Sequence, residues 1–298
     1  MCDETTDREL DEYLKRKAVT RRSFTLGGAA TVASSSLLLQ ACATPLPDPG
    51  TITETEVNVP TPDGEVDGLF IHPAQGAHAA VIMWPDIHGV RPAFFDMARR
   101  LAGSGYSVLA VNPYYRTMSG RLFPEGQSIR DSGGRELVGP HYTALSPDTV
   151  VVDAAALVAW LDTQDVVDTT RGIGAVGFCM TGSWTLRAAA AVPSRIRAPS
   201  SFHGGGLVSE EETSPHLLAG KIQGGVLIAI AENDHERDPE AQGALIAAFE
   251  TAGVPAEIEV YEDAMHGWVP TDGRAHNPEQ SQRAWGRMLA LFERELGA

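Results

Sequence analysis

One cysteine in the sequence stands where a thiol can act as a nucleophile. Cys179 lies within residues 177–182 (GFCMTG), between an apolar run over 172–178 and an alanine-rich helical pattern over 179–192. Small residues around the cysteine allow the sharp turn of a nucleophile elbow, which lifts one side chain above a sheet edge. At a helix start, the positive end of the helix dipole favours the thiolate, and the N–H of Met180 is placed to stabilise an oxyanion. We therefore predict that Cys179 is the nucleophile of a hydrolytic site.

Two side chains that follow Cys179 in the sequence complete a catalytic triad. Asp234 comes after the strand expected over 226–231, and His266 comes after the strand expected over 256–261. Carboxyl ends of parallel strands meet at one sheet edge, and the order nucleophile, acid, histidine is that of α/β-hydrolases. We predict that His266 takes the thiol proton and that Asp234 holds the imidazole in the required tautomer.

The elements that must position these residues alternate between short apolar runs and helical patterns. This alternation predicts an α/β fold in which a mostly parallel sheet is covered by helices on both faces. An antiparallel hairpin is expected at the start, over 51–59 and 66–72. The segment 117–146 is long, glycine-rich and weakly periodic, which predicts an insertion over the site. The other strands are expected over 79–84, 107–111, 172–178, 198–202, 226–231 and 256–261, and the helices over 93–103, 149–162, 179–192, 239–252 and 278–296.

The beginning of the chain has the pattern of an export signal. Arg21 and Arg22 directly precede an uncharged stretch over 24–39, an arrangement that resembles a twin-arginine signal. The stretch is shorter than the roughly 20 residues that a permanent membrane span needs. We therefore expect export by the twin-arginine route to the periplasm.

Two ways of processing this signal stay open. Residues 39–42 (LQAC) resemble a lipoprotein box, which would attach a lipid at Cys42, while cleavage after Ala43 would release a soluble protein. Membrane contact is expected only through the signal or that lipid. The expected organisation is an export signal over 1–43, a linker over 44–54 and a catalytic domain over 55–298.

Composition limits the partners and the redox chemistry of the protein. The formal net charge is -16, so the polyphosphate backbone of a nucleic acid would be repelled over most of the surface. Either way of processing removes Cys2 and removes or lipidates Cys42, which leaves Cys179 without a partner for an intramolecular disulfide. A small-molecule substrate is the expected partner.

These motifs together resemble the dienelactone hydrolase family over most of the chain, from about residue 55 to 295. The resemblance is specific at 177–180 (GFCM), 232–235 (ENDH), 261–267 (YEDAMHG) and 84–90 (WPDIHGV). It implies an α/β-hydrolase fold and hydrolysis of ester or lactone bonds in small carboxylic-acid substrates, through a thioester on the cysteine and without a cofactor. It also implies that the N–H of Ile87 joins that of Met180 in holding the oxyanion.

The sequence departs from the family pattern at the nucleophile. The family has a glutamate that interacts with the resting thiol, and the matching residue here is Asp86, one methylene shorter. The final glycine of the usual elbow is replaced by Thr181, a bulkier residue that is expected to strain the turn.

The substrate-binding residues also depart from the family. Two arginines grip the substrate carboxylate in the family; Arg116 matches the first, whereas Pro270 stands at the place of the second. Arg274 lies close enough in sequence to act in its place. Tyr115 and Trp268 are expected to line the substrate pocket, although single aromatic residues are equally often part of a core.

Other readings of the sequence are weaker. His203 begins an HGGG segment like that of lipases, but the lipase segment precedes the nucleophile and this one follows it. No histidine spacing matches a zinc site, so no metal is expected. Two other classes of function stay open: a periplasmic ligand-binding lipoprotein that lost turnover, indicated by Asp86, Thr181 and Pro270, and a thiol redox protein that uses Cys179.

Overall fold

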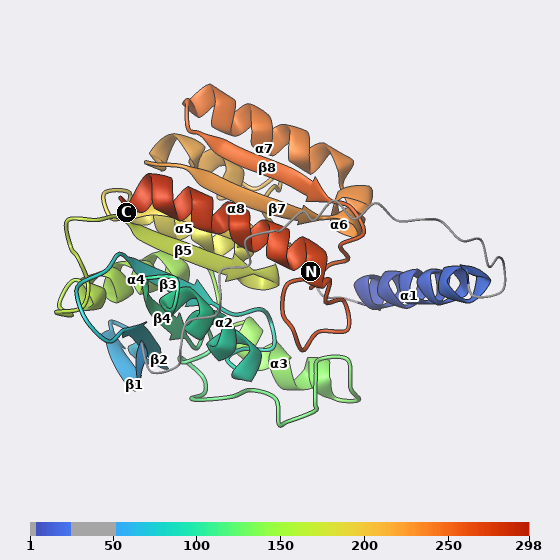
Figure 1. Ribbon diagram of the computed structural model, residues 1–298, viewed down its shortest axis with the longest axis horizontal. Coiled ribbons are helices and arrows are strands. Elements are labelled where there is room, and N and C mark those ends of the chain that lie inside the picture. The colour runs from blue at the N-terminus through green and yellow to red at the C-terminus, as the bar shows by residue number, and fades with distance from the viewer. Residues whose placement is uncertain (1–3, 25–51, 298) are drawn as a thin grey trace, which may run out of the picture.

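The computed structural model describes residues 4–24 and 52–297 of the 298-residue chain. An eight-stranded sheet forms its centre, in the order β1-β2-β4-β3-β5-β6-β7-β8 (Figure 1). The strands are β1 (Ile52–Thr61), β2 (Gly64–Pro73), β3 (Ala80–Trp84), β4 (Ser107–Val111), β5 (Ile173–Phe178), β6 (Ile196–Phe202), β7 (Val226–Ala231) and β8 (Ala256–Tyr261). The helices are α1 (Glu4–Phe24), α2 (Pro92–Ala102), α3 (Gly134–Tyr142), α4 (Pro147–Leu161), α5 (Gly182–Ala191), α6 (Glu232–Arg237), α7 (Pro239–Ala252) and α8 (Pro278–Leu296), with 3-10 turns η2 (Cys179–Thr181) and η3 (Pro215–Lys221).

The sheet has the predicted mixture of directions. β1 and β2 form an antiparallel hairpin that turns between Thr61 and Gly64, and β2 pairs antiparallel with β4. All pairs from β4 through β3 to β8 are parallel. The α/β-hydrolase-like fold class and the opening hairpin are therefore confirmed, and the carboxyl ends of six parallel strands share one edge.

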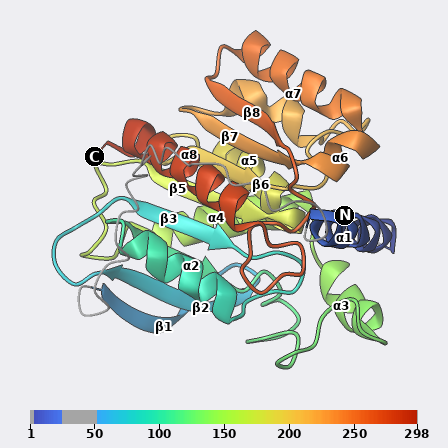
Figure 2. The same cartoon turned by 45° about the vertical axis from the view of Figure 1, so that its right-hand side comes forward.

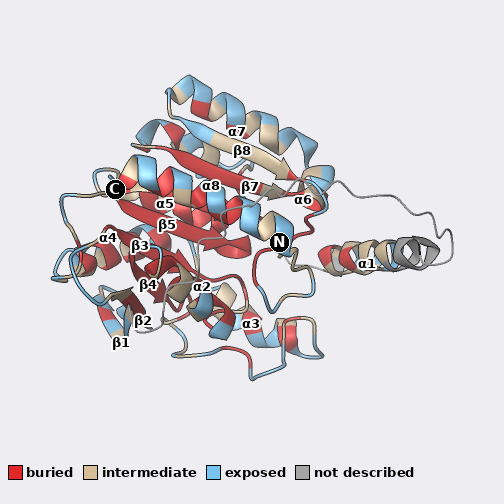
Figure 3. Cartoon of the chain, in the orientation of Figure 1, coloured by how far each residue is buried: buried red, intermediate tan, exposed pale blue. Residues whose placement is uncertain are grey.

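Two hydrophobic layers cover the sheet, one on each face. Apolar residues of α2 and α8, among them Phe94 and Trp285, pack on one face together with Val176 and Leu227 of the sheet. Residues of α4, α5 and α7 pack on the other face. Figure 3 shows that β5 and β7 are mostly buried, whereas the outer sides of α7 and α8 are exposed. The expectation that helices cover both faces is correct.

Three helices lie outside the predicted elements. α3 forms within the insertion over 117–146, and α6 follows β7 directly, so Asp234 lies in a short helix rather than in the predicted loop. α1 occupies residues that we assigned to the export signal. The rest of that signal, with Cys42 and the linker up to residue 51, lies outside the described residues, and β1 begins at Ile52.

The described helices give little indication of a membrane span. No single helix within residues 4–24 and 52–297 is both long and apolar enough to cross a bilayer. α3 and α4 taken together would match in length and composition, but the two helices are bent by 73° at the break between them.

Candidate active site

Cys179 has the strained backbone of a nucleophile elbow. Its φ angle is 54°, in the left-handed region that residues other than glycine rarely adopt, and the residue is only 2% exposed. Within the described residues, the other non-glycine residues with positive φ are His203 and Asp263. All three follow the carboxyl ends of parallel strands. Backbone strain that gathers at one edge of a sheet is typical of a functional site.

The elbow is held in shape by Thr181 and by two glycines. The Thr181 hydroxyl accepts a hydrogen bond from the N–H of Phe178 at 2.9 Å and lies 3.0 Å from the carbonyl oxygen of Trp84. A Cβ on Gly177 would lie 2.2 Å from the Thr181 carbonyl oxygen, and a Cβ on Gly182 would lie 2.4 Å from the Cα of Gly204. Thr181 itself has φ -89°, so the expectation that it strains the turn is wrong: its hydroxyl ties the elbow to the strand beside it.

His266 and Asp234 form the expected pair at the same sheet edge. The Nδ1 atom of His266 lies 2.6 Å from Oδ2 of Asp234, and the imidazole is almost completely buried. Burial opposes ionisation of Asp234, but the neighbouring His266 outweighs it and lowers the pKa of the carboxyl. Because Nδ1 bonds to the carboxylate, Nε2 is the basic nitrogen of the neutral ring.

A residue that the sequence did not single out positions the histidine backbone. Asn233, directly before Asp234, accepts a hydrogen bond from the N–H of His266 through Oδ1 at 2.8 Å. The Asn233 side chain is buried. One short helix therefore fixes both the ring of His266 and its main chain, and the only signal for it was the position of Asn233 inside the 232–235 motif.

Asp86 is held by an arginine that also reaches the histidine loop. Arg91 makes two hydrogen bonds to the Asp86 carboxylate, at 2.7 and 2.9 Å, and its Nε donates to Asp272 at 2.7 Å. Burial alone would raise the pKa of Asp86, yet Arg91 and His88 hold it well below the ordinary value. Arg91 thus ties the loop after β3 to the loop after His266. The expected contact of Asp86 with the thiol remains a prediction.

Ile87 and Met180, the two residues expected to supply the oxyanion N–H groups, both contact the side chain of Tyr114. The Tyr114 hydroxyl donates to the carbonyl of Ile87 at 2.7 Å and lies 3.6 Å from the sulfur of Met180. All three residues are buried. Tyr114 therefore connects the loop after β3 to the elbow, and the oxyanion role of the two N–H groups remains a prediction.

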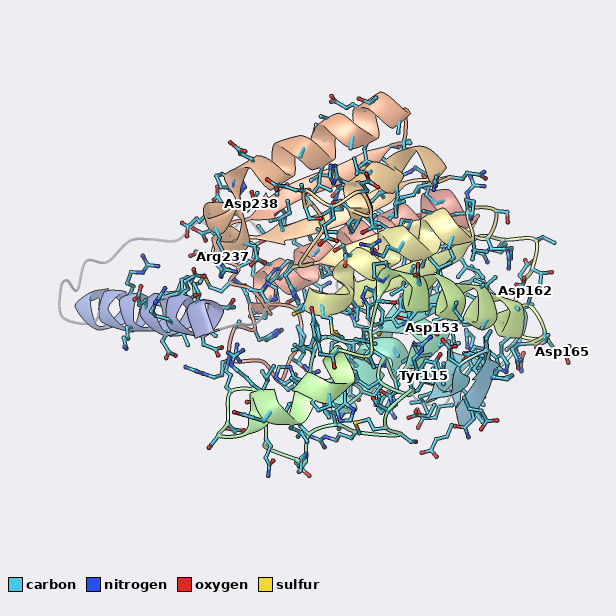
Figure 4. All side chains as sticks on the ribbon, turned by 180° about the vertical axis from the view of Figure 1, so that it is seen from behind. Tyr115, Asp153, Asp162, Asp165, Arg237 and Asp238 are labelled. Atoms are coloured by element: carbon cyan, nitrogen blue, oxygen red, sulfur yellow. The ribbon has the colours of Figure 1, made fainter. Side chains whose placement is uncertain are left out.

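Arg116 and Tyr115, expected to bind substrate, are engaged with carboxylates of the protein. Arg116 bonds to Asp153 of α4 at 2.7 and 2.9 Å and to Asp63 of the hairpin turn at 2.7 Å. The Tyr115 hydroxyl donates to Asp153 at 2.6 Å, and Figure 4 shows these two residues side by side. Together they join the hairpin to α4, so the arginine charge is already neutralised inside the protein.

Trp268 and His203 belong to an aromatic cluster beside His266. Trp268 is fully buried and stacks on Tyr261 with ring centroids 4.9 Å apart. The His203 ring lies edge-on to His266 at 5.1 Å and also contacts Trp268. Burial and the nearby His266 lower the pKa of His203 to about 3, so its ring is neutral and supports His266 by packing.

A cavity beside the elbow offers room for a substrate. Its volume is about 230 Å³, and it is lined by Met180, Trp184 and Arg187 after β5 and by Tyr142 and Leu145 of the insertion. Burial raises the pKa of the Tyr142 hydroxyl, and the charge of Cys179 adds to the effect. The sequence predicted that the insertion covers the site but gave no signal for Tyr142 or Arg187.

The described residues offer no evident metal site. Among residues 4–24 and 52–297, no group of three or more histidine, cysteine, aspartate or glutamate side chains is placed to hold an ion.

The fold and the site together define an α/β-hydrolase-like protein. Its eight-stranded sheet carries a cysteine with a left-handed backbone conformation after β5, an acid after β7 and a histidine after β8. The chain belongs to the dienelactone hydrolase family, whose model matches residues 66–296.

Individual relatives support this assignment at modest identity. The carboxymethylenebutenolidase of Rhodococcus opacus is 25% identical over 84% of this chain and 94% of its own length. A Synechocystis sp. protein that carries the same name as a provisional assignment is 27% identical over 82% of this chain and 98% of its own. A Klebsiella pneumoniae structure, provisionally named a dienelactone hydrolase, has a TM-score of 0.70 at 23% identity and covers 81% of this chain and 98% of its own, which supports the fold. Family and relatives together support a hydrolase.

Proposed function

We propose that this protein hydrolyses ester or lactone bonds of small carboxylic-acid substrates, with Cys179 as the nucleophile. The observation that carries the proposal is a buried cysteine whose backbone has the left-handed conformation. It lies at the same sheet edge as a hydrogen-bonded histidine and aspartate. A strained backbone at a single reactive side chain is costly and persists where it serves a function. The names of the relatives point to the same bond type.

The proposed reaction has two halves, and in each half His266 accepts one proton and then returns it. Nε2 of His266 takes the thiol proton of Cys179 as the sulfur attacks the carbonyl carbon, and the N–H groups of Ile87 and Met180 hold the oxyanion. The bond to the leaving oxygen breaks, and His266 returns the proton to that oxygen. Water then attacks the thioester while His266 accepts its proton, the carbon–sulfur bond breaks, and the carboxylic acid leaves. His266 returns that proton to the sulfur, which restores the thiol of Cys179. Asp234 stabilises the imidazolium in both halves.

The cavity beside Met180 is the proposed place of the substrate. It is apolar at Trp184 and Leu145 and carries one positive charge, Arg187, about one helical turn beyond the elbow. That charge suits a substrate with a carboxylate, a role for which Arg116 is poorly placed because Asp63 and Asp153 already neutralise it.

A kinetic screen with a matched pair of variants tests the proposal. We expect the wild-type chain to hydrolyse small aryl esters and lactones and Cys179→Ala to lose nearly all of that activity, because the nucleophile is absent. Cys179→Ser keeps a nucleophile of similar shape and should retain a small residue of turnover. Full activity of Cys179→Ala would refute the cysteine mechanism, and absence of turnover with saturable binding of the same compounds would instead support a ligand-binding protein.

We also propose that the protein is exported to the periplasm by the twin-arginine route. The proposal rests on the paired Arg21 and Arg22 before the uncharged stretch over 24–39.

A further inference from the structure

The rim of the candidate site is rich in arginine although the chain as a whole is strongly acidic. Four arginines surround the carboxyl ends of the strands, and each contributes to an ion pair with α1. They are Arg130 and Arg135 of the insertion, Arg237 of α6 and Arg274 of the loop after His266. A cluster of four arginines in a chain of net charge -16 indicates a surface suited to acidic groups of a partner.

The acidic half of α1 occupies this rim. Asp7 pairs with Arg130 and Arg135, Glu9 pairs with Arg237 at 2.6 Å, and Asp11 pairs with Arg274 at 2.6 Å. Further along the helix the charge reverses, and Lys17 pairs with Asp263 of the histidine loop at 3.2 Å. The charges of the helix therefore match those of the rim along its length.

One face of α1 docks on the body of the protein. Thr6, Leu10, Tyr13 and Lys17 recur at the spacing of a single helix face, and Leu10 is only 1% exposed. The Tyr13 hydroxyl donates to the carbonyl of Asp263 at 2.9 Å. Among residues 5–17 of the helix, whose burial is described, the exposed ones lie on the opposite face: Arg8, Glu12, Lys15 and Arg16. Such a division between buried and exposed faces is that of a packed helix.

Glu9 connects the helix to the catalytic pair. It accepts a hydrogen bond from Nδ2 of Asn233 at 2.7 Å, and Oδ1 of the same amide accepts from the N–H of His266. Glu9 also binds Arg237, whose guanidinium lies 3.8 Å from the Asp234 carboxylate. The position of α1 is thus linked to both members of the pair through single side chains.

We propose that α1 is an intramolecular lid that closes the hydrolase site by docking its first half, with Asp7, Glu9 and Asp11, on the arginine-rich rim. Figures 1 and 2 both place α1 beyond the carboxyl ends of β7 and β8, beside α6. With the helix docked, Cys179 and His266 are each only 2% exposed. α1 contacts the insertion, α6 and the loop after His266. It therefore bridges three segments around the site, and its undocking opens the way to the sulfur of Cys179.

The lid and the proposed export would be coupled. α1 contains Arg21 and Arg22 and ends at Phe24, so cleavage at the expected end of the signal, near residues 42 and 43, would remove the helix together with the signal. The same event that releases the exported protein would then expose the rim. The lid keeps the folded precursor latent until that cleavage.

The test measures access to the thiol in the full chain, independently of any ester. With Cys2→Ser and Cys42→Ser in the background, Cys179 is the only cysteine, and its alkylation by iodoacetamide reports its accessibility. Leu10→Asp places a charge at a buried contact, and Glu9→Gln removes the negative charge that pairs with Arg237. Glu12→Gln, on the exposed face, is the matched control. We expect the alkylation rate to rise at least about tenfold in Leu10→Asp, several-fold in Glu9→Gln and not at all in Glu12→Gln.

A salt titration keeps the proposal falsifiable if Leu10→Asp fails to fold. Salt screens ion pairs at the rim. In the chain with an unaltered α1, alkylation of Cys179 should therefore speed up from about 0.05 to 0.5 M NaCl. In Glu9→Gln the alkylation rate should depend less on salt. Equal rates in all folded variants and no salt dependence would overturn the lid.

The lid proposal rests on the proposed function only in that the lid closes a hydrolase site. The failure of one proposal can be told apart from the failure of the other. Faster alkylation together with faster ester hydrolysis in Leu10→Asp and Glu9→Gln supports both proposals. Faster alkylation without hydrolysis of any ester supports the lid and refutes the hydrolase.

Discussion

The two sides of the candidate site are held in place by different means. The elbow is fixed by its backbone: Gly177 and Gly182 leave no room for a Cβ, and the Thr181 hydroxyl ties the turn to β3. The histidine side is fixed by side chains, since Asn233 holds the main chain of His266 and Asp234 holds its ring. Strain in the first region is local, whereas the second depends on groups from several loops.

This difference shows where the site can be adjusted. Backbone constraints leave the elbow a single geometry, because Gly182 and Gly204 approach so closely that neither can carry a side chain. A hydrogen-bond network can be weakened one bond at a time, and α1 joins it through Glu9. We therefore expect substitutions at the elbow to act on folding and activity together, and substitutions on the histidine side to separate the two.

The largest separation is expected for Asp234→Asn. The amide is nearly isosteric, so folding should be retained, but it no longer stabilises the imidazolium or enforces the tautomer with its basic nitrogen at Nε2. We expect kcat for ester hydrolysis to fall by roughly 10³ to 10⁴-fold with little change in the melting temperature. Asp238→Asn, at the exposed end of the same helix, is the control and should leave both unchanged. A loss of activity that follows a loss of folded protein would contradict this division.

A smaller effect that falls on both quantities is expected for Gly182→Ala. The new methyl group would lie 2.4 Å from Gly204 Cα and 2.5 Å from Ser201 Oγ, so the elbow has to move. Overpacking of this kind costs about 1–3 kcal/mol of stability, and a nucleophile displaced by about 1 Å loses on the order of 10²-fold in rate.

Gly243→Ala is the matched control for the elbow variant. Gly243 lies within α7, and nothing lies within 4 Å of an added Cβ there. Alanine in an exposed helix is worth up to about 1 kcal/mol over glycine, so this variant should be slightly more stable and equally active. If Gly182→Ala matched it in chemical denaturation and in ester kinetics, the elbow would not be governed by its backbone.

The elbow was readable from the sequence because it depends on local residues. The GFCMTG segment contains both glycines and the threonine, and the strands around it are short apolar runs whose period and length identify them. β4, β7, β8, α7 and α8 have the bounds that their patterns predicted. The mostly parallel sheet with helices on both faces follows from the same alternation of strand and helix patterns.

The rim was not readable because it depends on pairs far apart in the chain. Arg91 and Asp272, or Glu9 and Asn233, show no periodicity and become neighbours only when the loops meet. Arg116 illustrates the same limit: its type suggested a substrate contact, whereas Asp63 and Asp153 come to it from the hairpin turn and α4. α1 was interpreted by its charge pattern as a signal alone, and its docking face was overlooked.

Asp86→Asn should give the smallest effect on activity and a measurable one on stability. Its carboxylate is paired with Arg91, which also binds Asp272, so the field of Asp86 at the thiol is largely compensated. Removing one partner of a buried pair costs about 3–5 kcal/mol when no other partner remains, and Asp272 should reduce that to roughly 2 kcal/mol. The pH midpoint of Cys179 alkylation should shift little.

The pH dependence of this stability difference follows from the sign of the shift. The pKa of Asp86 is lowered by folding, so its contribution is complete above the ordinary value of 3.8 and is lost as the pH falls through the lower folded value. Chemical denaturation should therefore show a constant advantage of wild type over Asp86→Asn between about pH 5 and 8 and a shrinking one below pH 3.8. A large shift of the alkylation midpoint with unchanged stability would instead assign Asp86 to the thiol, and with it to the elbow side of the site.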